Sequence, residues 1–307
     1  MRAAVIHGKN QAPVVEDFQA PEADGDALLI DITTGAIGPT DLMRAAGFFG
    51  PMAYPYVPAG EGTGRLADGS RVYFGHSVAP FGGWAERTLV PAAEVWPIPD
   101  EISDEHAVTL AISGTGALIP LEEARIQPGE RILILGATGP LGQLALQLAR
   151  LLGAGVVVGA ARDRDSLARV RERGWADEIV QLGQGDDLAA LKAAAGDGYD
   201  VILDTVYGPP AEAAMKASAP GARMMSIGVA AGATVTLGLG DLVMRSHIGV
   251  GTGQRPVAER RAAYERLLDY GMKAALTADV LVFPLDEAAD AWKAQSQSSH
   301  AKIIVRP

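Results

Sequence analysis

The sequence predicts an α/β protein in which a doubly wound parallel sheet is joined to a separate, β-rich part. After about residue 116, short apolar runs alternate with helical stretches, a pattern typical of parallel strands joined by crossover helices. Before about residue 114, Gly and Pro separate short strand candidates, as in an irregular barrel-like domain. The two patterns predict two domains, and a chain of 307 residues is long enough for both.

The composition narrows the class of partner. Charged residues make up 21% and hydrophobic residues 48% of the chain, as in an ordinary globular protein. A net charge of −11 argues against a nucleic acid or an anionic membrane as partner. The chain has no Cys, which excludes disulfides and cysteine-ligated zinc or iron–sulfur sites. We find no signal-peptide core and no run of the ~20 apolar residues that span a membrane, so we expect a cytoplasmic protein.

Hydrophobic periodicity and the spacing of Gly and Pro place the elements. In the first part, strands are expected at Ala3–Ile6, Ala27–Thr33, Gly64–Leu66, Arg71–Phe74 and Trp84–Val90. In the second part, strands are expected at 132–135, 156–161, 178–182, 201–205, 223–229 and 248–251, with helices near 140–152, 164–174, 186–195 and 210–219. The last expected elements are a helix at Val257–Gly271, a strand at Val280–Phe283, a helix at Asp286–Ala294 and a strand at Ala301–Val305.

The most informative stretch joins the first strand of the second part to the helix that follows. Ile132–Leu135 is an apolar run bounded by glycine, and Leu141, Leu144 and Leu148 lie at helical spacing. Glycine suits Gly136–Gly142 because the chain must turn sharply, approach a pyrophosphate and pack the helix tightly on the strand. Free N–H groups at the helix start then face the phosphates. The stretch predicts the phosphate-binding turn of a dinucleotide-binding Rossmann fold.

The spacing within this turn departs from the usual pattern Gly-x-Gly-x-x-Gly. Ala137 takes the first position, and Gly139 and Gly142 take the other two. We expect Gly139, Leu141 and Gly142 to hold the pyrophosphate, with Ala137 and Thr138 completing the loop. An ordinary strand-to-helix turn is the alternative, but the position between a strand and a helix favours the nucleotide site.

The next strand indicates which dinucleotide binds. Gly155–Ala161 is typical of a buried parallel strand, and it ends about 20 residues beyond the turn, where a ribose-binding residue belongs. An acid there accepts the 2′-hydroxyl of NADH, whereas Arg162 and Arg164 follow Ala161 and favour the 2′-phosphate of NADPH. Asp163 leaves NADH open, and the two arginines could also form only a solvated helix start.

A series of short segments surrounds the glycine turn. They are Ala36–Asp41, Val57–Gly64, Gly82–Glu86, Pro97–Asp100, Ile126–Glu130, Val201–Val206, Phe283–Ala289 and Ala301–Val305. In this order and spacing they resemble the medium-chain dehydrogenase/reductase superfamily, specifically its zinc-free quinone oxidoreductase (zeta-crystallin-like) branch, over nearly the whole chain. The resemblance implies a GroES-like catalytic domain at 1–114 and 251–307 and an NADPH-binding Rossmann domain at 115–250.

Two glycines in these segments bear on metal binding. Metal-dependent relatives have a Cys and a His where this chain has Gly38 and Gly60, so the resemblance implies that no metal is bound. The five histidines are scattered without ligand spacing, and each is expected to be an ordinary surface or core residue. Without a metal, alcohol oxidation loses its usual Lewis acid, whereas reduction of a conjugated acceptor remains feasible.

The resemblance also implies roles for residues near the reaction. Thr40 aligns with a hydroxyl that relays protons in metal-dependent relatives, although a turn or cap role suits it equally, and Asp41 is expected to be structural. Phe49 stands where relatives often have the Tyr that is a proposed proton donor in enoyl-thioester reductases, which argues against that activity. The nicotinamide end is expected beside Thr115, Ile227–Val229 and Val250–Thr252.

Together these features predict an NADPH-dependent reductase whose substrate is a small molecule, either a quinone or an α,β-unsaturated carbonyl compound. One alternative is an NADPH-binding structural or sensor protein without turnover, as lens crystallins of this family suggest. Others are an NADH-using reductase and an enoyl-thioester reductase. The family also implies a homodimer joined through edge strands, for which the apolar stretch Ser246–Gly251 is the candidate.

Overall fold

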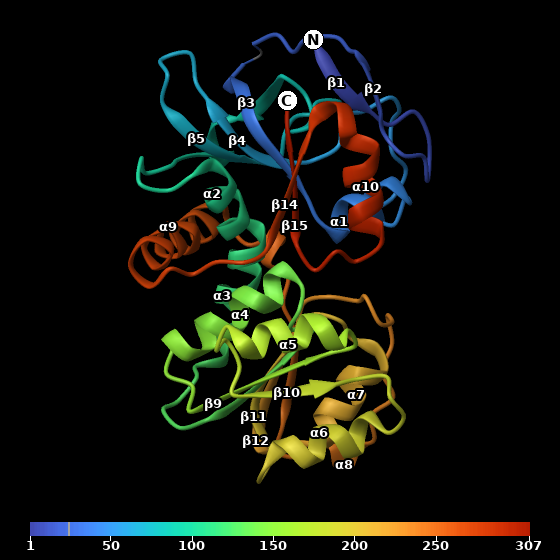
Figure 1. Cartoon of the computed structure of the whole chain (residues 1–307), viewed down its shortest axis with the longest axis vertical. Helices are drawn as coiled ribbons and strands as arrows, with labels where there is room; N and C mark the ends of the chain where they lie inside the picture. Colours follow the sequence, from blue (N-terminus) through green and yellow to red (C-terminus); the bar gives the residue numbers. More distant parts are fainter. Residues whose placement is uncertain (24) are drawn as a thin grey trace. The chain divides into compact units, whose positions relative to one another are not determined.

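The computed structural model describes residues 1–23 and 25–307, which form two compact units. Unit 1 comprises Met1–Ala111, Leu268–Ala275 and Asp279–Pro307, and unit 2 comprises Ile112–Leu267 and Leu276–Ala278 (Figure 1). From the sequence, the chain was expected to re-enter the first domain at residue 251, whereas residues 251–267 belong to unit 2. The reason is local packing: Arg255 and Arg266 form ion pairs with Glu123 and Glu122 of the same unit.

Unit 2 contains a six-stranded parallel sheet in the order β10-β9-β8-β11-β12-β13. Counted from its first strand, this is the order 3-2-1-4-5-6 of a doubly wound dinucleotide-binding fold, so the predicted fold class is confirmed. The strands are β8 (Arg131–Leu135), β9 (Val156–Ala161), β10 (Glu178–Gln181), β11 (Tyr199–Asp204), β12 (Ser218–Ser226) and β13 (Ser246–Gly249).

Helices cover both faces of this sheet. Leu133 and Leu135 of β8 belong to the same buried cluster as Leu191 and Ala214, which come from helices on one face. Ile132 and Ile134 point to the other face, and they are fully buried as well. The helices are α3 (Ile112–Ala124), α4 (Pro140–Leu151), α5 (Arg164–Glu172), α6 (Asp187–Ala195), α7 (Gly208–Lys216), α8 (Leu239–Leu242), the 3₁₀ helix η2 (Thr252–Gln254) and α9 (Val257–Ala274), which runs on into unit 1.

Unit 1 is β-rich, as predicted. Its larger sheet has the order β14-β15-β3-β4-β5-β7, with β6 paired to β3, and β1 and β2 form a separate ribbon. Trp84 is fully buried in its core and meets Trp292 edge-on at a centroid distance of 6.2 Å. The strands are β1 (Arg2–Val5), β2 (Val14–Asp17), β3 (Ala27–Ile37), β4 (Glu61–Arg65), β5 (Arg71–Gly75), β6 (Arg87–Pro91), β7 (Val95–Pro97), β14 (Val280–Pro284) and β15 (Lys302–Arg306).

Unit 1 also holds η1 (Ala92–Glu94), η3 (Leu285–Glu287) and α10 (Ala288–Ser296). Four α-helices of the described residues were not predicted, namely α1 (Pro39–Ala45), α2 (Asp104–Leu110), α3 and α8. Helix α3 shows why. It contains Gly114, Gly116 and Pro120, which disfavour a helix, and it is buried almost all round, so it has no polar face to mark the helical period. No helix among the described residues combines the length and the apolar run that crossing a membrane requires.

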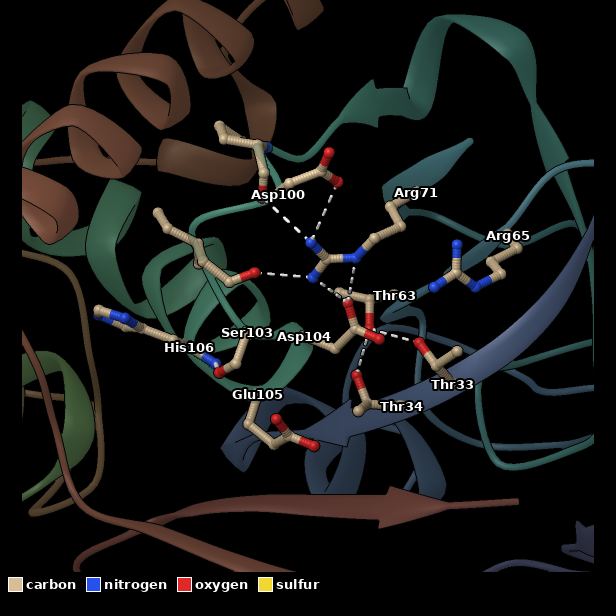
Figure 2. Close-up of polar contacts among 12 residues, drawn as sticks. Thr33, Thr34, Thr63, Arg65, Arg71, Asp100, Ser103, Asp104, Glu105 and His106 are labelled. Atoms are coloured by element: carbon tan, nitrogen blue, oxygen red, sulfur yellow. Dashed lines mark hydrogen bonds and ion pairs between the residues drawn. The ribbon is translucent and has the colours of Figure 1, made fainter. Parts of the chain in front are cut away.

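One arginine fixes the segment that leads into α2 (Figure 2). Arg71 of β5 donates hydrogen bonds to the carbonyl oxygens of Pro99 (3.1 Å) and Ile102 (2.7 Å) and to the Asp104 carboxylate (2.6 Å). Ser103 then caps the helix by accepting the N–H of His106 at 3.2 Å. These contacts give a structural role to the Pro97–Asp100 segment, one of the segments on which the family resemblance rests.

A buried ion pair crosses the larger sheet of unit 1. Glu61 on β4 and Lys302 on β15 form an ion pair, and each side chain is only 4% exposed. The Tyr73 hydroxyl donates to the other Glu61 oxygen at 3.3 Å. Because water does not solvate these two side chains, the charge of each is stabilised by the charge of the other.

Candidate functional site

The glycine turn after β8 is shaped by close backbone contacts. The N–H groups of Gly136 and Ala137 donate to the carbonyl of Ala160 at 2.9 and 3.1 Å, which ties the turn to β9. Gly136 has a φ of +78°, and a Cβ there would lie 2.1 Å from the Thr205 hydroxyl. The turn thus needs glycine at Gly136, a position just before the residues that the sequence motif covers.

Gly139 and Gly142 have different surroundings. A Cβ on Gly142 would lie 2.2 Å from the Gly136 carbonyl oxygen, so this glycine lets helix α4 pack against the turn. A Cβ on Gly139 would have no protein atom closer than 3.8 Å. The space beside Gly139 is therefore open to a ligand, as a pyrophosphate site requires.

Two backbone donors face this space from the start of α4. Among the described residues, the N–H groups of Leu141 and Gly142 have no hydrogen-bond acceptor. The carbonyl of Thr138, which could have accepted the Gly142 N–H, instead accepts the buried Gln143 side chain at 2.7 Å. Free N–H groups at a helix start attract anions, so this geometry fits the pyrophosphate of a dinucleotide.

The remaining residues of the turn act through their backbone. Ala137 is fully buried and Thr138 is 4% exposed, so their side chains pack within the protein. Gln143 was not predicted, because at helical spacing it falls on the side opposite to the apolar face formed by Leu141, Leu144 and Leu148, so its polarity gave no signal. Its amide shapes the turn by occupying the Thr138 carbonyl.

The end of β9 carries two exposed arginines, Arg162 and Arg164. Among the described residues, neither guanidinium forms an ion pair. Asp163 is the acidic residue because of which the sequence also allowed NADH as the cofactor. It is the N-cap of α5 and accepts the N–H of Ser166 at 2.7 Å. The carboxylate is thus engaged in capping, whereas Arg162 is free to reach a phosphate.

An open pocket of about 530 Å³ lies where β12 and β13 end. It brings together three residues predicted for the nicotinamide end, Ile227, Val229 and Val250. The other two, Thr115 and Thr252, are not among its described lining residues; Thr115 is buried in α3 and donates to the Ile112 carbonyl at 3.3 Å. The pocket also includes Tyr207, Ser226, Gly228, His247 and Gly249, which the sequence did not predict.

A chain of hydrogen-bonded side chains leads from the buried Asp204 to two residues that line this pocket, Ser226 and His247. Asp204 at the end of β11 accepts the Ser226 hydroxyl at 2.7 Å, and Ser226 lies 2.9 Å from Nε2 of His247. Burial raises the pKa of the Asp204 carboxyl, while the N–H groups of Tyr207 and Val206 and the Ser226 hydroxyl oppose this increase. No local sequence signal links the three residues, because they come from three different strands.

In unit 1, Thr40 is exposed at the second position of α1. The capping role that the sequence left open for it belongs to Asp41, whose carboxylate accepts the Gly38 N–H at 2.9 Å. Burial raises the pKa of Asp41, which is consistent with its expected structural role. Phe49 is 59% exposed and stacks edge-on with Phe48 at 5.2 Å.

Comparisons with known proteins bear on the family and the fold. A family model described as zinc-binding dehydrogenase matches residues 140–268. The chain is 28% identical to a phenolphthiocerol/phthiocerol polyketide synthase subunit of Mycobacterium tuberculosis, over 97% of this chain but only 14% of that much longer protein. It is 26% identical to the acryloyl-coenzyme A reductase of Metallosphaera sedula, over 74% of this chain and 76% of that enzyme.

A solved structure gives the same fold over the full length. The quinone oxidoreductase from Thermus thermophilus, determined alone and in complex with NADPH, aligns with a TM-score of 0.83. The sequences are 27% identical, and the alignment covers 100% of both chains.

The zinc named in the family description does not fit the residues of this chain. Gly38 and Gly60 have no side chain that could bind a metal, so neither position offers a ligand. The described residues contain no cluster of three or more His, Cys, Asp or Glu side chains that could hold a metal ion.

Proposed function

We propose that this chain, which belongs to the quinone oxidoreductase-like branch of the medium-chain dehydrogenase/reductase superfamily, is a zinc-independent, NADPH-dependent reductase. Its substrate is a quinone or an α,β-unsaturated carbonyl compound. The observation that carries the proposal is the open space beside Gly139, which the free N–H groups of Leu141 and Gly142 face. When bound, NADPH supplies the hydride, and the protein supplies binding and orientation.

The kind of substrate that accepts the hydride is inferred from the groups that the chain lacks. A simple ketone becomes a localised alkoxide when it takes up hydride, and this charge needs a metal or a strong acid nearby. Gly38 and Gly60 provide no metal ligand. A conjugated acceptor spreads the charge to a distant oxygen, which backbone N–H groups or a hydroxyl can stabilise. The direct test is consumption of NADPH with a panel of quinones, enones, enoyl thioesters and saturated ketones.

The same substrate panel, run with NADPH and with NADH, separates the other candidate functions. An NADH-using reductase would turn over equally well with NADH, and a structural or sensor protein would bind NADPH without turnover. Activity confined to thioesters would indicate an enoyl-thioester reductase, the class of activity named by the Metallosphaera sedula relative. The exposed Phe49 does not supply the hydroxyl that a Tyr would donate there.

Arg162→Ala is expected to weaken NADPH binding about 10- to 100-fold, because a charge-assisted hydrogen bond to the 2′-phosphate is lost. NADH binding should not change. The measurement is the dissociation constant of each cofactor by fluorescence titration. Arg171→Ala, which removes an exposed arginine from the last turn of the helix that follows Arg162, α5, is the matched control and should leave both affinities unchanged. Equal affinity of the wild type for NADPH and NADH would contradict the proposed preference.

Thr40→Val is expected to slow quinone or enone reduction without abolishing it. The exposed hydroxyl assists protonation of the reduced product, general acid help is typically worth ~10²–10⁴-fold, and water replaces part of it. Steady-state kcat measures the effect, and Thr40→Ser should restore the rate. Wild-type kcat in Thr40→Val would remove Thr40 from the mechanism.

We also propose a homodimer formed through β13, the edge strand of the parallel sheet. Val243, Met244 and Ile248 leave apolar side chains 53%, 73% and 45% exposed on or beside this edge. An exposed apolar edge invites pairing with another strand, and a second copy would cover it. Ile248→Lys should give a monomer by sedimentation at micromolar concentration. Val14→Lys, at an equally exposed apolar site of unit 1, should leave the dimer intact, and a monomeric wild type would refute the proposal.

A further inference from the structure

Asp204, Ser226 and His247 fix a definite pattern of donors and acceptors. Asp204 is fully buried at the end of β11, and its Oδ1 accepts the N–H groups of Val206 (3.0 Å) and Tyr207 (2.8 Å). Its Oδ2 accepts the Ser226 hydroxyl at 2.7 Å. All three partners donate, so the surroundings of Asp204 are built for a carboxylate.

The hydrogen bonds of Asp204 and Ser226 then determine which tautomer a neutral His247 ring adopts. A serine hydroxyl has a single proton, and Ser226 gives it to Asp204, so its oxygen must accept from Nε2–H of His247 at 2.9 Å. A neutral imidazole carries one proton, which leaves Nδ1 with a bare lone pair. Among the described residues, Nδ1 has no hydrogen-bond partner.

The position of this ring suggests the ligand. His247 lines the pocket at the carboxyl ends of β12 and β13, the edge at which doubly wound sheets bind their ligands. Tyr207 lies beside it at a centroid distance of 5.7 Å and an interplanar angle of 34°. Gly249, which also lines the pocket, leaves space in it, because a Cβ there would meet nothing within 4 Å. The described part of the pocket thus offers the rings of Tyr207 and His247 and, at Nδ1 of His247, an unpaired acceptor.

We propose that Asp204 and Ser226 hold His247 as its Nε2–H tautomer, so that Nδ1 accepts an N–H from the carboxamide of the bound nicotinamide. This inference rests on the proposed function, because it places the nicotinamide end of NADPH in the pocket that contains Ile227, Val229 and Val250. His247 is then a cofactor-binding residue, and Asp204 and Ser226 are positioning residues that act through it.

Three ligands test the contact with the carboxamide. NADP⁺ carries the amide, nicotinic acid adenine dinucleotide phosphate carries a carboxylate in its place, and adenosine 2′,5′-bisphosphate lacks the nicotinamide. The wild type should bind NADP⁺ more tightly than the carboxylate analogue. His247→Phe should lower this preference about 10-fold, the effect of one hydrogen bond, and leave affinity for the bisphosphate unchanged. The unchanged bisphosphate affinity shows that the variant is folded.

The positioning roles have a spectroscopic signature. Nitrogen-15 NMR of wild-type protein, at a pH where histidines are neutral, should show His247 protonated at Nε2. Ser226→Ala should give a mixture of tautomers and the same loss of preference for the amide, and Ser226→Thr should restore both.

An Nδ1–H tautomer in the wild type, or an unchanged preference in folded His247→Phe, would overturn this inference alone. A wild type that binds neither NADP⁺ nor the bisphosphate would overturn it together with the proposed function.

Discussion

Gly139→Val should abolish most NADPH binding while leaving the fold intact. The nearest protein atom to a Cβ at Gly139 would be 3.8 Å away, so the protein accommodates the start of a side chain. The valine methyl groups then occupy the space in which the pyrophosphate meets the N–H groups of Leu141 and Gly142. Losing two charge-assisted hydrogen bonds of about 1.5 kcal/mol each corresponds to roughly 100-fold or more in the dissociation constant.

The neighbouring glycine is the control for this variant. A Cβ on Gly142 would lie 2.2 Å from a backbone carbonyl oxygen, so Gly142→Ala should lower the midpoint of thermal unfolding as well as the affinity. Gly139→Val should keep the wild-type midpoint in the absence of cofactor. Wild-type affinity for NADPH in Gly139→Val would show that the phosphates bind elsewhere.

Glu61→Ala is expected to destabilise unit 1 by about 3–5 kcal/mol, the usual cost of leaving one member of a buried ion pair without its partner. The Lys302 ammonium would remain in the sheet with its side chain 4% exposed and without its ion-pair partner. Tyr73 would also lose its hydrogen bond to Glu61. The free energy of unfolding from urea titration measures the loss.

Two controls distinguish the cost of an unpaired buried charge from the cost of removing side-chain atoms. The double variant Glu61→Gln with Lys302→Met removes both charges and should recover most of the lost stability, because hydrophobic replacement of a buried pair is often neutral. Asp31→Ala breaks an ion pair with Arg87 whose side chains are 64% and 58% exposed, and it should cost less than about 1 kcal/mol. A cost for Glu61→Ala as small as that of Asp31→Ala would contradict the account.

The parallel sheet and the glycine turn could be predicted because their signals are local. Ile132–Leu135 is apolar since it is buried on both faces, and the glycines follow it directly. The same stretch supported the family resemblance, which the comparisons confirm. The predicted nucleotide-binding residues remain predictions, although the geometry around Gly139 is consistent with them.

What the sequence did not predict depends on contacts between distant segments. His247 was expected to be an ordinary residue, because nothing near it in the chain marks its partners. The register of β12 with β13 pairs His247 with Met224, so Ser226, two residues further along β12, lies diagonally across on the same face and within hydrogen-bond distance. The pairing of β11 with β12 places Asp204 opposite Ser226. Helix α3 was missed for a related reason: its burial by the rest of unit 2 outweighs the cost of Gly114, Gly116 and Pro120.

Turnover by the purified protein tests the central claim most directly. NADPH oxidation should be followed at 340 nm with naphthoquinone and a simple enone, and NADP⁺ reduction with a secondary alcohol, each before and after treatment with a chelator. We predict that NADPH is consumed with a quinone or an enone, that the chelator leaves this rate unchanged, and that the alcohol is not oxidised. Efficient oxidation of the secondary alcohol, without activity on any quinone or enone, would contradict the account.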